Sequence, residues 1–182
     1  MLSKLISKFD KNPNTVYVNT FESPVGTVIA AADENYLYIA TFEDSKNFEK
    51  CFDVVAKELS CKYILKKNEV LQTFEKELSA YFEGKLKKFT IPIKTFGSDF
   101  QKEVWKKLMD LPYGSTQSYG DLAKDLGRSA SHSRAVGAAC GANALLIVVP
   151  CHRLVASGSK GGYNSGVDRK DKLIELEKKG SM

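Results

Sequence analysis

The sequence of 182 residues predicts an α+β protein with two domains, a small α/β domain with an antiparallel sheet over residues 1–95 and a mostly helical domain over residues 96–182. Two observations lead to this prediction. β-rich runs separated by turn residues come first in the chain, and amphipathic helical patterns follow them. The composition then changes, because eleven of the 13 glycines lie at or after Gly97. This change places the domain boundary near residues 93–98.

The first domain is predicted from strand, turn and helix signals in sequence order. A short amphipathic helix is expected within residues 2–9, where apolar residues fall at helical spacing. Three strands joined by turns should then form an antiparallel meander, at residues 16–21, 27–31 and 36–42. Two amphipathic helices are expected at residues 47–59 and 70–82. The segment 89–93 contains a proline, so it is expected to be an edge strand or an extended linker.

The second domain is predicted to contain a helix-turn-helix. Ser98 is a good N-cap for a first helix that runs to about Leu108. A short helix at residues 119–126, a break at Gly127 and a further helix through about Cys140 then give two helices joined by a glycine-containing turn. The apolar run 144–149 is expected to be a strand that ends at a proline.

The distribution of charge favours an anionic partner. The formal net charge is +5, all four arginines and both histidines lie in the second domain, and residues 126–165 contain no Asp or Glu. A surface that carries arginine and lacks carboxylates suits nucleic acid. The alternative is that this stretch, which is rich in Ala, Gly and Val, is simply small and buried.

Several classes of protein are not expected. The run 144–149 is the longest apolar one and is far shorter than the roughly 20 residues of a membrane span, so no membrane partner is expected. The N-terminus lacks the features of a signal peptide, which indicates a cytoplasmic protein, or a nuclear one in a eukaryote. Four cysteines without a Cys-x-x-Cys pair and two histidines predict neither a metal site nor a disulfide framework. No cofactor is expected.

The chemistry is expected at the segment Pro150-Cys151-His152-Arg153. A thiol beside a histidine and an arginine favours a lowered thiol pKa, and the thiolate is the nucleophilic form. Adjacent side chains on an extended chain point to opposite sides, so His152 can help Cys151 only where the backbone turns or a water bridges them. The alternative is a buried cysteine at a strand end with an incidental histidine neighbour.

A longer pattern consists of residues 133–137 (SRAVG), Asn143, residues 150–153, Gly162-Tyr163, Lys170 and Glu177. This pattern resembles the O6-alkylguanine-DNA alkyltransferase family. The resemblance is dense over residues 97–180 and looser around residues 81–85 and 23–26. It implies a ribonuclease H-like N-terminal domain with a supporting role, and a C-terminal winged-helix or helix-turn-helix domain that carries the active site.

The resemblance also implies a function. The protein would be a DNA repair enzyme, a methylated-DNA–[protein]-cysteine S-methyltransferase. It would flip O6-alkylguanine out of duplex DNA and transfer the alkyl group irreversibly to Cys151, once per molecule. The implied partner is a DNA duplex containing O6-alkylguanine, with O4-alkylthymine as a further candidate lesion, and the implied state is a monomer. Two alternatives are a non-catalytic lesion sensor, whose known examples lack the cysteine, and a thiol hydrolase that turns over and does not need Arg134.

The resemblance assigns roles residue by residue. Cys151 would be the acceptor, His152 a base acting through a water, and Glu177 the carboxylate that orients it. Asn143 would form the hinge after the recognition helix, and Tyr119 would contact the flipped guanine and help protonate the leaving purine. Arg134 would enter the base stack. The other implied DNA contacts are Ser133, Ala135 and Tyr119, and the implied pocket residues are Arg153, Leu154, Tyr163, Asn164, Ser165 and Lys170, with the loop 155–166 as the pocket wall.

The chain departs from the family pattern in and around these residues, including His132 and Ser133, where small apolar residues are more usual. Ala144 stands where a proline is usual, Leu154 where a valine is usual and Ser165 where a glycine is usual. The added side chain of Ser165 predicts a narrower pocket mouth. Cys51, Cys61 and Cys140 match no family role and are expected to be structural thiols.

Overall fold

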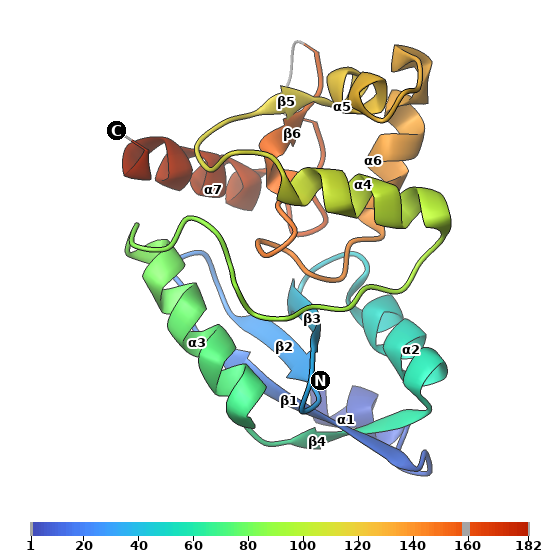
Figure 1. Ribbon diagram of the computed structural model, residues 1–182. Coiled ribbons are helices and arrows are strands. Elements are labelled where there is room, and N and C mark those ends of the chain that lie inside the picture. The colour runs from blue at the N-terminus through green and yellow to red at the C-terminus, as the bar shows by residue number, and fades with distance from the viewer. Residues whose placement is uncertain (1, 158–160, 182) are drawn as a thin grey trace. The chain divides into compact units, whose positions relative to one another are not determined.

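The computed structural model describes residues 2–157 and 161–181 of the chain. It divides into two compact units, Met1–Phe96 and Gly97–Met182 (Figure 1). Within the described residues no helix is both long enough and apolar enough to cross a membrane.

The first unit is built on a four-stranded sheet with the order β3-β2-β1-β4. The three predicted strands are present as β1 (Asn14–Phe21), β2 (Val28–Ala32) and β3 (Leu37–Phe42), and they pair antiparallel as expected. The fourth strand, β4 (Cys61–Leu65), was not predicted, and it pairs parallel with β1. The expectation of a purely antiparallel sheet is therefore wrong at this edge. The short sequence CKYIL follows the preceding helix through the single left-handed residue Ser60 (φ 49°), so neither Gly nor Pro marks its start.

Helices cover this sheet. The predicted helices are α2 (Phe48–Leu59), which contacts β3 and β4, and α3 (Glu69–Phe82), which contacts β1 and β2; both flank the sheet in Figure 1. The short helix α1 (Leu2–Ser7) packs against β4. Every residue of β2 and β3 is buried, so these strands are covered on both faces. The segment 89–93 is an extended linker that touches the sheet through one bridge, between Leu37 and Ile93.

The second unit is mostly helical. Helix α4 begins with a capping box in which Ser98 and Gln101 satisfy each other's backbone N–H groups, as expected of a Ser N-cap. Helix α6 packs against α4 and α5, and the Nε1 of Trp105 on α4 donates a hydrogen bond to the carbonyl of Ala139 on α6 (2.8 Å). The elements of this unit are α4 (Asp99–Met109), β5 (Gln117–Ser118), α5 (Tyr119–Asp125), the 3₁₀ turn η1 (Ala130–His132), α6 (Ser133–Gly141), the 3₁₀ turn η2 (Cys151–Arg153), β6 (Leu154–Val155) and α7 (Val167–Gly180).

The run 144–149 is not the predicted strand. Apart from one bridge residue, Leu145, it forms a compact series of turns in which Ile147 takes a left-handed conformation (φ 72°). A β-branched residue rarely adopts this conformation, so the surrounding contacts must impose it. The side chain of Asn143 bonds to the backbone of Leu145 and Val149, on either side of Ile147. Apolar composition identified this run as buried, but it could not distinguish a buried turn from a buried strand.

Candidate active site

Two consecutive turns hold Cys151. Pro150 has φ −81° and ψ 64°, the conformation of an inverse γ-turn, and the N–H of Cys151 donates to the carbonyl of Val149 (2.8 Å). The 3₁₀ turn η2 follows at once, closed by a bond from the N–H of Arg153 to the carbonyl of Pro150 (3.0 Å). The backbone is therefore not extended at Cys151 and His152, and the geometric objection to their cooperation does not apply.

Asn143 ties the end of α6 to the thiol. Its Nδ2 donates to the carbonyl of Val149 (3.0 Å) and to Sγ of Cys151 (3.3 Å). Its Oδ1 accepts a hydrogen bond from the N–H of Leu145 (2.9 Å). The residue is only 1% exposed, so these bonds are made away from water. One amide thus closes the turns 144–149 and positions the sulfur.

The thiol of Cys151 is buried, and burial raises its pKa to about 11. The hydrogen bond from Asn143 and the charge of Lys170 lower the pKa but do not offset the burial. The expectation of a lowered pKa from sequence neighbours is therefore wrong. Arg153, one of those neighbours, directs its guanidinium to Glu177 and not to the sulfur. The site holds a neutral thiol at neutral pH, and the thiolate has to be generated during the reaction.

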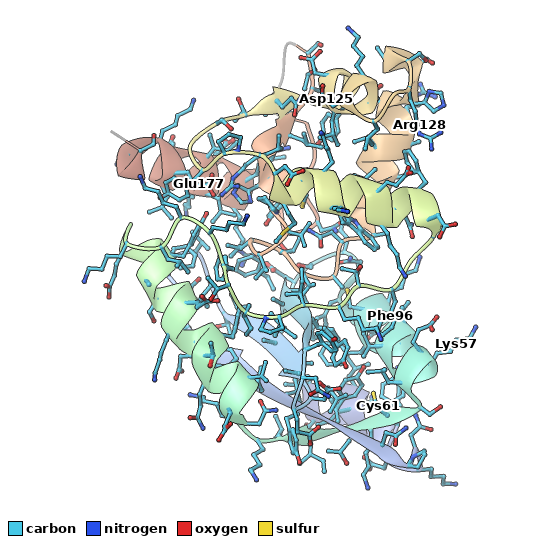
Figure 2. All side chains as sticks on the ribbon, in the orientation of Figure 1. Lys57, Cys61, Phe96, Asp125, Arg128 and Glu177 are labelled. Carbon is cyan, nitrogen blue, oxygen red and sulfur yellow. The ribbon has the colours of Figure 1, made fainter. Side chains whose placement is uncertain are left out.

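Glu177, which lies on α7 and is labelled in Figure 2, forms hydrogen bonds with the two residues that follow the cysteine, His152 and Arg153. Its Oε2 lies 2.6 Å from Nε2 of His152 and accepts a bond from Nη2 of Arg153 (3.1 Å). Its Oε1 accepts bonds from Nε of Arg153 (2.8 Å) and from the N–H of Gly114 (3.3 Å). Burial alone would raise the pKa of this carboxyl group, but the hydrogen bonds from His152 and Arg153 outweigh it and lower the pKa to about 2. Glu177 is therefore a carboxylate whose charge Arg153 balances.

His152 is fully buried, and burial lowers its pKa despite the neighbouring carboxylate. A neutral imidazole that donates from Nε2 to Glu177 keeps its lone pair on Nδ1. That Nδ1 is buried and has no hydrogen-bond partner among the described residues. The arrangement leaves a basic nitrogen in the interior of the site.

A second cluster contains Lys170 and Tyr119. The Nζ of Lys170 donates to the hydroxyl of Tyr119 (3.3 Å) and to the carbonyl of Gly162 (3.0 Å). Lys170 is fully buried, which lowers its pKa, and its charge acts on the thiols of Cys151 and Cys140. Burial, together with the electrostatic influence of the same two cysteines, raises the pKa of Tyr119 to about 12. Lys170 and the partly buried Tyr119 thus form a hydrogen-bonded pair whose pKa values are coupled to that of Cys151.

Gly161 is required by the position of Tyr119. It has φ +73°, and a Cβ there would lie 2.8 Å from the Tyr119 hydroxyl. Only glycine meets both conditions. The loop before α7 can therefore pass directly over the phenol ring.

The structure brings some of the predicted site residues together and leaves others apart. Asn143 contacts the sulfur of Cys151, Lys170 contacts Tyr119, and the burial of Tyr163 together with the electrostatic influence of Cys151 raises the pKa of its phenol. Ser133, Arg134 and Ala135 form the first turn of α6, where Arg134 and Ala135 are exposed.

The remaining predicted pocket residues serve mainly as supports. The guanidinium of Arg153 binds Glu177 and the carbonyl of Leu111, and Leu154 is fully buried in β6. The amide of Asn164 anchors its loop to the carbonyl of Gly141 (3.0 Å), and the carbonyl of Ser165 accepts a bond from Arg169 (3.1 Å). Of the predicted pocket wall at 155–166, residues 158–160 lie outside the described part.

Cys140, which is expected to be a structural thiol, is buried near the end of α6, and burial raises its pKa well above the ordinary value. Sequence reasoning missed Gly114, whose N–H donates to Glu177 (3.3 Å), because no local signal marks a contact between residues 63 positions apart. Across the described residues, no group of three or more His, Cys, Asp or Glu side chains is arranged to hold a metal ion.

These features define a class of protein in which a cysteine nucleophile is followed in the chain by a histidine paired with a glutamate. The cysteine lies in the same unit as a helix-turn-helix, formed by α5 and α6. Comparison with known families narrows the class. Residues 99–179 match the DNA binding domain of 6-O-methylguanine DNA methyltransferase, and residues 16–95 match the ribonuclease-like domain of the same family. The chain belongs to the 6-O-methylguanine DNA methyltransferase family.

Individual relatives agree with this assignment. The methylated-DNA–protein-cysteine methyltransferase of Methanosarcina acetivorans is 39% identical over 164 residues, which are 89% of this chain and 98% of the relative. The inducible methylated-DNA–protein-cysteine methyltransferase of Bacillus subtilis is 41% identical over 138 residues, 75% of this chain and 76% of the relative. The crystal structure of Mycobacterium tuberculosis OGT in complex with DNA superposes with a TM-score of 0.76 at 32% identity, covering 90% of this chain and 94% of that one.

Proposed function

We propose that this protein repairs DNA by transferring the alkyl group, methyl above all, from O6 of guanine to Sγ of its own Cys151. The observation that carries the proposal is one buried sulfur that accepts a hydrogen bond from Asn143 and is followed in the chain by the His152–Glu177 pair. The names of the relatives and the DNA complex of the M. tuberculosis protein support it. A thioether has no easy leaving route, so each molecule reacts once.

The first step is removal of the thiol proton. Nδ1 of His152 is the free basic nitrogen, and a single bridging water would carry the proton to it from Cys151. Glu177 accepts the Nε2–H of His152 and stabilises the imidazolium that forms. The thiolate then attacks the alkyl carbon in line with the C–O6 bond. The S–C bond forms, the C–O6 bond breaks, and its electron pair moves onto the purine.

The purine anion then needs a proton. The hydroxyl of Tyr119 is the donor in this proposal, and Lys170, which donates to the same oxygen, stabilises the phenolate or replaces its proton. A Lys170 pKa lowered by burial makes this transfer easier, because an ammonium group with a lower pKa releases its proton more readily. In this proposal the His152–Glu177 pair thus acts on the attacking sulfur, and the Lys170–Tyr119 pair acts on the departing purine.

The target carbon is shielded inside a duplex, so the guanine has to be flipped out. The first turn of α6 would lie against the minor groove, with Arg134 filling the space left by the base and Ser133 and Ala135 contacting the strand. The absence of Asp and Glu from residues 126–165 removes repulsion with phosphate. We also propose that O4-alkylthymine is a secondary substrate, that the protein acts as a monomer in the cytoplasm, and that residues 1–95 form a domain that supports residues 96–182.

The test is mass spectrometry of the intact protein and of its peptides after mixing with a duplex that contains one O6-methylguanine. We expect a stoichiometric gain of one methyl group on the Cys151 peptide, without turnover, and no gain in the Cys151→Ser variant. Tight binding without methyl gain would overturn the proposal in favour of a lesion sensor. Turnover of more than one equivalent would instead indicate a hydrolase.

Ser165 leads to a prediction about substrate size. Its side chain is buried at the end of the loop that precedes α7, where an added hydroxymethyl group narrows the pocket mouth. Transfer from O6-benzylguanine is therefore expected to be slower than transfer from O6-methylguanine. The Ser165→Gly variant should raise the benzyl rate about tenfold and leave the methyl rate nearly unchanged. Single-turnover rates measure both, and equal or faster benzyl transfer by the unmodified protein would contradict the prediction.

A further inference from the structure

The turn that follows α4 lies against the ion pair of Arg153 and Glu177. Residues 112–115 (PYGS) form a β-turn, closed by a bond from the N–H of the last residue to the carbonyl of the first (3.2 Å). Gly114 is the third residue and has φ +83°, the value that a type II turn requires at this position. Tyr113 is the second residue, the other corner position of the turn.

Three groups of this segment contact the ion pair. The carbonyl of Leu111 accepts a hydrogen bond from Nη1 of Arg153 (2.8 Å), and the N–H of Gly114 donates to Oε1 of Glu177 (3.3 Å). The guanidinium lies over the ring of Tyr113, with Cζ of Arg153 5.8 Å from the ring centroid. An aromatic face attracts a cation, and more strongly where the cation is removed from water, as the buried Arg153 is. The ring therefore adds a third support to the carboxylate and the carbonyl that hold the guanidinium.

The phenol ring of Tyr113 also packs against the last turn of α7. Its hydroxyl oxygen is buried, and a Cβ added at Gly180 would lie 3.1 Å from both Cε1 and Cζ of the ring. A Cβ added at Gly114 would lie 2.7 Å from Cβ of Ser181. Burial and the charge of Glu177 raise the pKa of Tyr113, so the phenol stays neutral. The helix that carries Glu177 thus limits the movement of the ring.

We propose that Tyr113 is a positioning residue for alkyl transfer, because its ring keeps the guanidinium of Arg153 on the carboxylate of Glu177. The inference rests on the proposed function, in which His152 accepts the thiol proton. Arg153 balances part of the negative charge of Glu177, so the carboxylate holds a proton on His152 less strongly. The position of Arg153 thus helps to keep His152 in the neutral form that the reaction needs.

The charges around His152 give the direction of the expected change. Burial lowers the pKa of His152 most, Glu177 raises it, and the charges of Arg153 and Lys170 lower it. The turn η2, which carries His152, packs against α7 and α4. The buried residues of α4 include no charged side chain; they are Val104, Trp105 and Leu108. Without the aromatic ring the guanidinium gains freedom to leave Glu177, and both effects of that movement raise the pKa of His152.

The first measurement is the titration of His152, followed by NMR of its ring signals. The chain has two histidines, and the exposed His132 serves as the internal reference. In Tyr113→Leu, which removes the ring, the midpoint for His152 is expected to rise by about one pH unit, the scale on which a neighbouring charge acts. Tyr113→Phe keeps the ring and should restore the midpoint of the unmodified protein.

The second measurement is the pH dependence of single-turnover methyl transfer. Because the base must be neutral, the rate falls on the acid side, and in Tyr113→Leu this fall should move to higher pH by the same amount as the midpoint of His152. Below the midpoint the rate should be about tenfold lower than in the unmodified protein, and on the alkaline side it should change by less than about twofold. Tyr36→Leu makes the same substitution at an exposed tyrosine of the first unit and should leave the profile unchanged. Each rate comes from the time course of the reactive fraction, so partial unfolding of a variant changes the amplitude and not the rate.

The outcomes separate the two claims. An upward move of both the midpoint and the acid fall in Tyr113→Leu, reversed in Tyr113→Phe, supports the role of Tyr113. An unchanged midpoint, or a rate that is lowered equally at every pH, overturns it and shows that Tyr113 is only a packing residue. Failure of the unmodified protein to take up methyl would overturn the proposed function, whereas the titration of His152 does not depend on activity.

Discussion

Replacing Glu177 by glutamine is expected to lower the free energy of unfolding by about 3–5 kcal/mol at neutral pH. The amide cannot balance the buried charge of Arg153, whose guanidinium makes two bonds to the carboxylate. The same change should slow alkyl transfer about 100-fold, because the proposed base His152 loses its anionic partner. Chemical denaturation and single-turnover kinetics measure the two effects. Glu175→Gln is the matched control, since Glu175 is exposed on the same helix and should change stability by less than about 0.5 kcal/mol.

The pH dependence of stability gives this prediction a distinct signature. The folded pKa of Glu177, about 2, lies below its ordinary value of 4.5, so its contribution is complete above about pH 4.5 and is lost as the pH falls through about 2. The pKa of His152 is also lowered from 6.5, so protonation in acid opposes folding in the same direction. We expect the unmodified protein to lose stability steadily in acid and Glu177→Gln to lose less. Parallel acid profiles for the two proteins would show that Glu177 is not the linked group.

Asn143→Ala is expected to produce the second large effect. It leaves the N–H of Leu145 buried without its partner, at about 1–3 kcal/mol, and removes one of the two hydrogen bonds to the carbonyl of Val149. It also frees the sulfur of Cys151, so transfer should slow about 100-fold through loss of positioning. The thiol pKa should rise further, because the Asn143 bond is one of the influences that lower it. The rate of thiol modification by iodoacetamide as a function of pH measures that pKa directly.

Asn143→Asp separates these contributions. The aspartate can still accept the bond from Leu145 but cannot donate to Val149 or to the sulfur. It should therefore be more stable than the alanine variant at acidic pH, where the carboxyl group is protonated, and still slow in transfer. A transfer rate close to that of the unmodified protein in either variant would show that the amide does not position the thiol.

Most helices and the residues of the site could be predicted from the sequence, because amphipathic periods and a dense motif carry local information. Ser98 and Gln101 illustrate this, since their capping box depends only on residues three apart. β4 was missed because its pairing with β1 is a long-range property of a short, unmarked segment. The turns 144–149 were read as a strand because an apolar run does not reveal its backbone conformation.

The raised pKa of Cys151 also could not be predicted from the sequence. The neighbouring His152 and Arg153 indicated a lowered thiol pKa, but in the folded structure Arg153 binds a carboxylate 24 residues away and the sulfur is buried. Sequence patterns thus selected residues that the fold brings into contact, Asn143 with Cys151 and His152 with Glu177, and tertiary packing decided their protonation.

The bond between Trp105 and Ala139 has a practical consequence. Trp105 is the only tryptophan in the chain, it is buried, and its indole N–H is fixed to the residue that precedes Cys140. The tryptophan fluorescence of the protein therefore originates at one point, the contact between α4 and α6. A change in this emission on alkylation would report a change at that contact in real time, without an attached dye.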